Sequence, residues 1–191
     1  MNIKSQRLYA LMLFLFYLGS VSAEVVFDGT IGPNAAGSMR SGDFTITQND
    51  GVVAGSNLFH SFESFSVRDG ESASFTSSAS VNNILARVTG DNSSGPSYRS
   101  FNKNYTGLFG TLNSDVNLWI INPNGVVFGK GFEANINGSL HISTGDLVSF
   151  KNGPNFYAYL SLQGSELLVV SDPIGFGFLG GRERGSFFQN L

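Results

Sequence analysis

The side chains best suited to acid–base or metal chemistry are few and isolated in the sequence. The chain contains two histidines and no cysteine. His60 precedes Glu63, and His141 precedes Asp146, so each histidine has one nearby carboxylate. A structural zinc site takes about four Cys, His or carboxylate ligands, and neither pair supplies them. Aromatic residues also flank His60, which indicates a packed strand. We therefore expect no metal, no cofactor and no catalytic residue.

Two further patterns bear on enzymatic function. β-Helical polysaccharide lyases and hydrolases need carboxylates that converge on one surface, whereas the acidic residues here are scattered singly. Gly175 to Gly180 fits the G-x-G-x-x-G pattern of dinucleotide-binding folds. That fold also requires a βαβ unit and an acidic residue about 20 positions later, and 11 residues follow Gly180. We interpret the chain as a non-enzyme, with a β-helical polysaccharide-active enzyme as an alternative.

Four turn-forming residues, Asn122-Pro123-Asn124-Gly125, follow an apolar segment. In a type I turn, Asn at the first position bonds the backbone ahead of it, and Pro at the second presets φ. Asn and Gly suit the third and fourth positions. Pro123 also favours an extended Asn122, which would close a strand. The four residues predict a tight corner between two buried strands, which by itself assigns no function.

Short strands and frequent turns are the elements expected to position this corner. Glycine accounts for 24 of 191 residues and phenylalanine for 18, while 13% are charged. No clean helical stripe of apolar residues appears after residue 23, and β-prone runs are bounded by turn formers. These features predict an all-β fold. We expect strands at residues 25–27, 44–47, 57–59, 64–67, 73–75, 84–88, 116–121, 126–128, 134–136, 140–143, 147–150, 156–160 and 167–170.

The strand spacing leaves two all-β architectures open. Turns about 8–12 residues apart suit a sandwich or a barrel. From residue 112 to 150, however, very short strands alternate with corners, and Asn-Gly occurs at both 124–125 and 137–138. Short strands with Asn and Gly at their corners suit a parallel β-helix, in which successive coils stack. Periodicity alone does not decide between these architectures.

The N-terminal segment has the order of a secretory signal peptide. Lys4 and Arg7 precede an apolar run at residues 10–18, and small residues end at Ala23. The run is too short to span a bilayer, which takes roughly 20 residues, so we expect cleavage after residue 23 and no transmembrane segment afterwards. Cleavage leaves nine basic and 14 acidic side chains, a net charge of −5 (9 − 14). This acidity, without any basic run, argues against a nucleic-acid partner.

Two segments are expected to lie outside regular structure. Residues 89–107 are polar and rich in turn formers, which predicts a long surface loop. Its aromatic residues Tyr98, Phe101 and Tyr105 motivate cell-surface glycans as a second class of partner. Residues 181–191 are Gly-rich at their start and carry clustered charge, so we expect a poorly ordered tail or truncated end.

The residues around the predicted corner resemble a known family. Residues 117–129, Asn-Leu-Trp-Ile-Ile-Asn-Pro-Asn-Gly-Val-Val-Phe-Gly, resemble the signature of the haemagglutination-activity, or two-partner-secretion, domain of filamentous-haemagglutinin-like proteins. Further matches occur in order, and the resemblance covers residues 24–180. The additional matching segments are residues 57–67, 83–90, 110–112, 135–146 and 172–180.

The resemblance implies a fold, a partner and a role. The fold is a right-handed parallel β-helix with an N-terminal cap and short extra-helical β elements. The partner is an outer-membrane β-barrel transporter whose periplasmic domains recognise the exoprotein after Sec export, in a bacterial secretion route that serves adhesion. The product is extracellular or associated with the cell surface at the outer membrane. The residues expected to carry fold and partner recognition are Asn122, Pro123, Asn124, Gly125, Asn135, Asn137 and Gly138.

Overall fold

The computed structural model describes residues 25–67, 70–90, 108–111, 115–126, 128, 132–159 and 168–180. The expected signal peptide at residues 1–23 and the expected tail at 181–191 lie outside these ranges, as does most of the expected loop at 89–107. Within the described ranges the chain is all-β, with one 3-10 turn and no α-helix.

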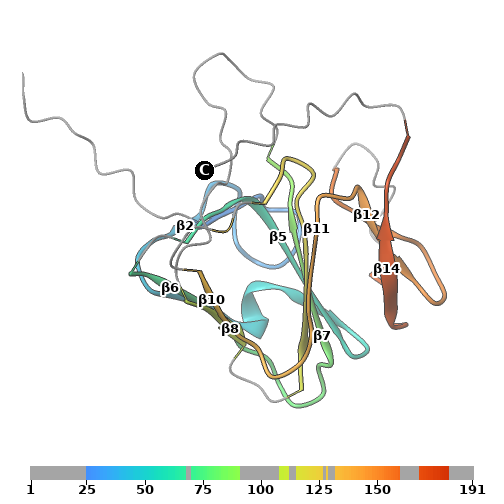
Figure 1. Cartoon of the computed structure of the whole chain (residues 1–191), viewed down its shortest axis with the longest axis horizontal. Coiled ribbons are helices and arrows are strands. Elements are labelled where there is room, and N and C mark those ends of the chain that lie inside the picture. Colours follow the sequence, from blue (N-terminus) through green and yellow to red (C-terminus); the bar gives the residue numbers. More distant parts are fainter. Residues whose placement is uncertain are drawn as a thin grey trace, which may run out of the picture.

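The strands form three sheets arranged as three layers (Figure 1). The middle layer is a seven-stranded sheet, with the four-stranded sheet on one side and the three-stranded sheet on the other. The seven-stranded sheet contains β1 (Val25–Phe27), β2 (Met39–Arg40), β4 (Val52–Ala54), β5 (Asn57–Phe65), β7 (Asn83–Val88), β9 (Asn117–Ile121) and β11 (Leu140–Ser143). The four-stranded sheet contains β3 (Phe44–Ile46), β6 (Ser72–Phe75), β8 (Leu108–Thr111) and β10 (Glu133–Asn135). The three-stranded sheet contains β12 (Leu147–Phe150), β13 (Phe156–Tyr157) and β14 (Pro173–Gly177).

From β5 to β11 the chain alternates between the first two sheets. In the seven-stranded sheet, β5, β7, β9 and β11 pair in sequence order and all in parallel. In the four-stranded sheet, β3, β6, β8 and β10 do the same. The N-terminal strands differ, because β1 and β4 pair antiparallel to β5, and β2 pairs antiparallel to β1. Each passage of the chain therefore adds one strand to both sheets.

Parallel register lines up residues of the same kind. Leu58 lies beside Ile84, which lies beside Leu118, and Leu140 follows in the same row. This row, together with the other rows on the same face of the sheet, faces the four-stranded sheet. There Phe75 and other apolar side chains complete an inner core. Alternating side chains point to opposite faces of a strand, so every second residue of β7 and β9 enters this core, whereas in β5 the alternation breaks after Phe62 and Phe65 enters it.

The other face of the seven-stranded sheet is covered by the three-stranded sheet. Phe59, Leu85 and Trp119 form a row on that face. They pack in an outer core whose other side includes Val148 and Phe156. Because β7 is covered on both faces, all six of its residues are buried, including the polar Asn83 and Arg87. A strand covered on both sides tends toward a continuous apolar run, as at residues 84–86, and the buried polar residues of β7 need hydrogen-bond partners.

Several strand predictions require correction. The runs at 57–59 and 64–67 belong largely to one nine-residue strand, β5. No strand covers the described residues of 126–128 or 167–170, and Phe128 is 49% exposed rather than buried. The prediction of a buried strand at residues 126–128, directly after the corner, was therefore wrong for its described residues. Strands β2, β4, β8 and β14 were not predicted, because two to four residues, or a Gly-rich run, give little periodic signal.

Candidate recognition site

The corner at Asn122–Gly125 directly follows β9 and is held by its own hydrogen bonds. The backbone N–H of Gly125 donates to the carbonyl of Asn122 at 3.0 Å. The side-chain Oδ1 of Asn122 accepts from the backbone N–H of Asn124 at 3.1 Å. Gly125 has φ +112°, a value that favours glycine. These bonds confirm the turn predicted from the four residue types.

The corner also stacks on the preceding passage of the chain. The Asn124 side-chain amide donates to the carbonyl of Gly90 at 2.5 Å. The Gly90 N–H in turn donates to the carbonyl of Glu63 at 3.0 Å. A Cβ on Gly90 would lie 2.2 Å from that same carbonyl oxygen, so only glycine fits between the two layers. Three successive passages are thereby joined at one end of the seven-stranded sheet.

The first residue of the corner is buried, whereas the other three are partly exposed. Asn122 is fully buried, and its backbone N–H donates to Ser143 of β11 at 3.0 Å. Its Nδ2 is buried without a hydrogen-bond partner in the described part of the chain. Pro123, Asn124 and Gly125 are half-buried. The corner is therefore a short, partly exposed surface whose buried first residue is hydrogen-bonded to β11.

The remaining predicted site residues lie elsewhere. Asn135 ends β10, in the other sheet. Asn137 and Gly138 lie between β10 and β11. A Cβ on Gly138 would lie 2.4 Å from the carbonyl oxygen of Val116, which precedes β9, whereas Asn122 follows β9. The structure therefore places the two Asn-Gly corners at opposite ends of the seven-stranded sheet and does not bring the predicted residues together.

A ladder of asparagine side chains was not foreseen from the sequence. Asn57, Asn83 and Asn117 begin β5, β7 and β9 and lie in one row. Asn117 Nδ2 donates to Asn83 Oδ1 at 3.1 Å, and Asn83 Nδ2 donates to Asn57 Oδ1 at 3.0 Å. At one end, Asn57 Nδ2 donates to the carbonyls of Val169 and Ser171 at 2.9 and 2.7 Å. We call these three side chains the asparagine ladder.

The other end of the asparagine ladder reaches β11. The N–H of Ser139 donates to Asn117 Oδ1 at 2.9 Å. The asparagine ladder therefore joins three parallel strands and connects them both to β11 and to the segment before β14. The signal in the sequence was present, since each strand begins with Asn, but register is needed to see it.

Arg87 forms a second buried polar connection. Its guanidinium is fully buried and donates to Ser61 Oγ at 2.6 Å and to Thr30 Oγ1 at 2.9 Å. It also donates to the carbonyl of Tyr157 at 2.9 Å and lies 5.0 Å from the centre of the Phe156 ring. Arg87 therefore links β7 to β5, to the N-terminal segment and to the three-stranded sheet.

Asp28 lies on the other side of the same hydroxyl groups. Its carboxylate accepts from Ser61 at 2.5 Å, Thr89 at 2.7 Å and Thr30 at 2.7 Å. Burial acts to raise the pKa of Asp28, but the hydrogen bonds from Ser61, Thr30 and Thr89 outweigh it, and the pKa lies below its ordinary value. The carboxylate is thus held ionised beside the buried guanidinium, with hydroxyl groups between them.

Comparison with protein-family models identifies the chain. The model of the TPS secretion domain matches residues 23–187. The chain belongs to the two-partner-secretion domain family. Neither the comparison with curated proteins nor that with solved structures gave a match. Membership places the chain among the secretion domains of haemagglutinin-like exoproteins, which leave the cell with a dedicated transporter as partner.

The two histidines of this two-partner-secretion domain lie against aromatic side chains. His60 is fully buried between Phe62 and Phe75, and neither ring nitrogen has a hydrogen-bond partner among the described residues. Burial lowers the pKa of His60 to about 4, although the carboxylate charge and the backbone of nearby Asp50 act to raise it. His141 stacks on Trp119 with 3.9 Å between ring centres. Over the described ranges, no group of three possible metal ligands occurs.

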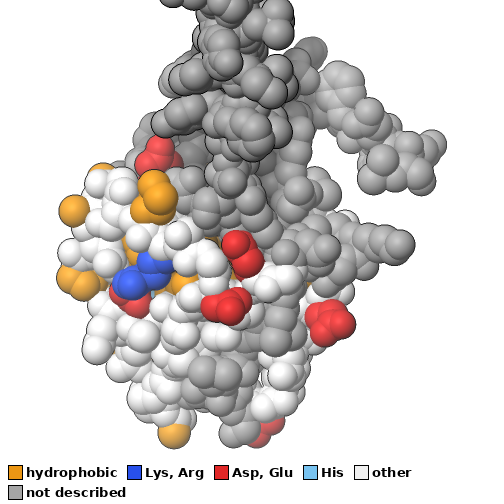
Figure 2. Space-filling model, turned by 90° about the vertical axis from the view of Figure 1, so that its left-hand side faces the viewer, with side chains coloured by type: hydrophobic (Ala, Val, Ile, Leu, Met, Phe, Trp, Pro, Cys, Tyr) orange, Lys and Arg blue, Asp and Glu red, His pale blue; other side chains and the backbone are white. Residues whose placement is uncertain are grey.

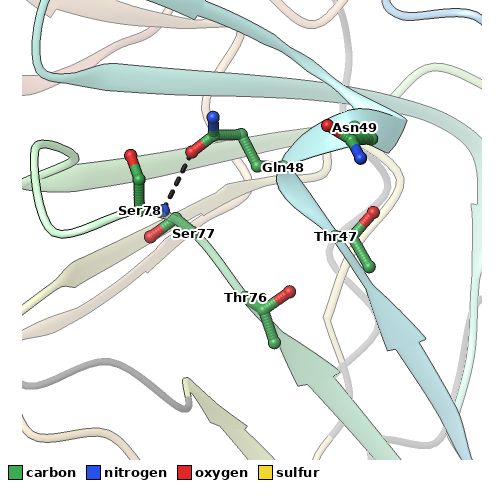
Figure 3. A pocket seen from close by; sticks show the side chains of 6 residues that line it. All are labelled: Thr47, Gln48, Asn49, Thr76, Ser77 and Ser78. Atoms are coloured by element: carbon green, nitrogen blue, oxygen red, sulfur yellow. Dashed lines mark hydrogen bonds between the residues drawn. The ribbon is translucent and has the colours of Figure 1, made fainter.

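The face over the four-stranded sheet is mainly uncharged, with scattered acidic side chains (Figure 2). A shallow pocket lies where β3 and β6 end, and its lining carries no charge (Figure 3). Across it, the N–H of Ser78 donates to Gln48 Oε1 at 2.9 Å. The lining residues are Thr47, Gln48, Asn49, Thr76, Ser77 and Ser78. None of the described residues forms a helix that is long and apolar enough to cross a membrane.

Proposed function

We propose that this domain is the segment by which its exoprotein is recognised in the periplasm by the transporter's periplasmic domains. The observation that carries the proposal is the Asn122–Gly125 corner, whose buried first residue holds three half-buried residues in one conformation. A preformed surface loses little conformational entropy on binding. On this proposal, residues 1–23 direct Sec export, and the exoprotein then reaches the cell surface, where it serves adhesion.

We further propose that the domain is a right-handed parallel β-helix. The support is the alternating parallel addition of β5, β7, β9 and β11 to one sheet and of β3, β6, β8 and β10 to the other. The antiparallel strands β1, β2 and β4 would form the N-terminal cap, since they cover the start of the stack instead of extending it. The three-stranded sheet would be the extra-helical element. Caps of this kind shield strand edges that would otherwise pair with other chains.

Secretion of corner variants tests the recognition role. Asn122→Ala removes the Oδ1 that accepts from Asn124, and Asn124→Ala removes the bond to Gly90. We expect both variants to be exported to the periplasm but released to the medium at about one tenth of the normal level or less. A loss of about 1.4 kcal/mol of recognition free energy corresponds to a tenfold effect. The amounts in periplasm and medium are measured with the cognate transporter present.

The matched control is Asn137→Ala. Asn137 was also expected from the sequence to take part in recognition, but it lies at the opposite end of the sheet from Asn122–Gly125, so we propose that it is not part of the same surface. This variant should be secreted normally. Thermal unfolding of each purified variant separates a recognition defect from a folding defect, and direct binding to the transporter's isolated periplasmic domains confirms the step affected. Normal secretion of both corner variants would contradict the role of the corner.

A second candidate function, direct adhesion to glycans, is favoured by the uncharged pocket between η1 (Gln48–Asp50) and the end of β6. Hydroxyl and amide side chains are suited to hydrogen-bond a neutral, hydroxyl-rich ligand. The aromatic residues that motivated this idea, Tyr98, Phe101 and Tyr105, lie outside the described residues. Glycan binding by the chain and by a Gln48→Ala/Thr76→Ala variant tests this function. Absence of binding by the unaltered chain would end it.

A further inference from the structure

The chain contains three Asn-Gly pairs, at 124–125, 137–138 and 152–153, and this pair has an intrinsic chemistry. The glycine nitrogen can lose its proton to a base and attack the asparagine Cγ. A C–N bond forms, the amide leaves as ammonia, and a cyclic succinimide results. Water then opens the ring to aspartate or isoaspartate. The reaction needs a free glycine N–H and an asparagine side chain that can turn toward it.

At the recognition corner both reacting groups are restrained. The N–H of Gly125 donates to the Asn122 carbonyl, and the Nδ2 of Asn124 donates to the Gly90 carbonyl. Cyclisation at Asn124 must break both hydrogen bonds and so release the Asn124 side chain from the Gly90 carbonyl. The corner is therefore protected by the same contacts that shape it.

Asn137–Gly138 has no such restraint. Asn137 is exposed, and no described residue hydrogen-bonds its side chain or the N–H of Gly138. Gly138 itself is packed so closely against Val116 that a side chain at this position would collide with the Val116 carbonyl. The fold thus requires glycine after Asn137 while leaving the asparagine side chain free to react.

We propose that Asn137 is a self-modification site, converted to aspartate or isoaspartate in the folded domain while Asn124 is spared. Asn152 is intermediate. Its side chain is exposed, but its backbone N–H donates to Ser171 Oγ at 3.1 Å, and its carbonyl accepts from the same hydroxyl. These bonds involve neither reacting group, but they hold the backbone that must rotate for the attack. The expected order of conversion in the folded domain is Asn137, then Asn152, then Asn124.

Conversion at Asn137 has a structural consequence. Isoaspartate inserts one extra carbon into the backbone and adds a negative charge. The change falls between β10 and β11, next to Ser139, whose N–H donates to the end of the asparagine ladder. Because Gly138 cannot shift away from Val116, the added length is expected to strain this connection. We expect the modified domain to unfold at a temperature about 2–4 °C lower.

Peptide mass mapping of the purified chain, incubated at mildly alkaline pH, measures the rates at all three sites. We expect Asn137 to convert about tenfold faster than Asn124 or more. Each hydrogen bond that must break at Asn124 slows the reaction by roughly a factor of ten. The same incubation in urea removes the protection and should bring the rates close together. Isoaspartate-specific labelling identifies the product.

Two variants complete the test. Asn137→Gln should abolish the modification of its peptide, because glutamine would form a larger and slower ring, and should leave the Asn152 rate unchanged. Asn124→Ala should leave the Asn137 rate unchanged. Equal rates at Asn124 and Asn137 in the folded chain, or no conversion at Asn137 under either condition, would overturn the proposal.

Discussion

His60 shows how one buried side chain can make this domain sensitive to acid. Its ring lies in the inner core, with the Phe75 ring centre 5.6 Å away, and its nitrogens lack hydrogen-bond partners among the described residues. The folded pKa of about 4 lies below the ordinary value of 6.5. Between these values the unfolded chain binds the proton and the folded domain does not. The stability contributed by neutral His60 is therefore complete above pH 6.5 and is lost as the pH falls toward 4.

We predict that the free energy of unfolding falls by about 3 kcal/mol between pH 7 and pH 4, since each pKa unit corresponds to about 1.4 kcal/mol. In His60→Leu this fall should largely disappear. Urea unfolding at several pH values measures it. His141→Leu is the matched control: the pKa of His141 is also lowered by burial, but its side chain is half-buried, so its removal should change the pH dependence less. Equal pH dependence in His60→Leu and the unaltered chain would refute the assignment.

Single residues also mark the limit of prediction from sequence. The corner at Asn122–Gly125 was predictable because all its determinants are adjacent in the chain. The burial of Arg87 was not, since its partners Thr30, Ser61 and Tyr157 are remote in sequence. A lone arginine in a strand normally indicates a solvent-facing position. Tertiary hydrogen bonds reversed that expectation here.

At the scale of elements, the asparagine ladder connects the parallel strands to the three-stranded sheet. Asn57 at one end holds the carbonyls of Val169 and Ser171, and Asn117 at the other end holds the N–H of Ser139. Removing a buried partner costs about 1–3 kcal/mol, because the group left behind is unpaired. The two ends of the same ladder therefore make a matched pair of sites.

We predict that Asn57→Ala and Asn117→Ala destabilise the domain by about 1–3 kcal/mol each but loosen different regions. Hydrogen exchange should speed up at residues 151–152 and 171–172 in Asn57→Ala, because the Lys151 N–H donates to the Asp172 carbonyl beside the lost anchor. In Asn117→Ala the faster exchange should appear at Ser139 and β11. The same exchange pattern in both variants would show that the two ends of the asparagine ladder do not stabilise separate regions.

The sequence predicted element type well and architecture poorly. Period-two apolar patterns and turn residues located most strands, as at Leu140–Ser143 and Leu147–Phe150. They split β5 in two because Ser61 and Glu63 interrupt its apolar pattern, although Ser61 is buried through its bond to Arg87. Local pattern alone left sandwich and β-helix undecided, because strand partners such as Leu58 and Ile84 are set only by register, which local pattern does not report. The expectation of a parallel β-helix came from the family resemblance, and the structure confirms its all-β class.

At the scale of the whole molecule, one sheet separates two apolar cores. The inner core lies between the seven-stranded and four-stranded sheets, and the outer core lies beneath the three-stranded sheet. Ile84 and Leu85 are neighbours in β7, both fully buried, but they enter different cores. This arrangement allows the two cores to be perturbed separately from one strand.

We predict that Ile84→Ala and Leu85→Ala each cost about 2–5 kcal/mol, as expected for truncation of a large buried aliphatic side chain. Their effects on cooperativity should differ. Leu85→Ala should let the three-stranded sheet open before the rest of the domain. This opening would be seen as early hydrogen exchange at Asp146 and Ala158, whose N–H groups donate to the carbonyls of Gly177 and Asp146. Ile84→Ala should instead lower the stability of the whole domain. Unfolding followed by hydrogen exchange and by circular dichroism distinguishes the two. Opening of the three-stranded sheet in Ile84→Ala but not in Leu85→Ala would contradict the division.

The asparagine ladder has a direction. Asn117 donates to Asn83, Asn83 donates to Asn57, and Asn57 donates to two carbonyls that can only accept. The three amide dipoles therefore align head to tail and polarise one another. Turning a single amide over would set donor against donor or acceptor against acceptor, so all three must turn together or not at all. The carbonyls at one end can only accept, and the Ser139 N–H at the other end can only donate, so both ends favour the same orientation of all three amides.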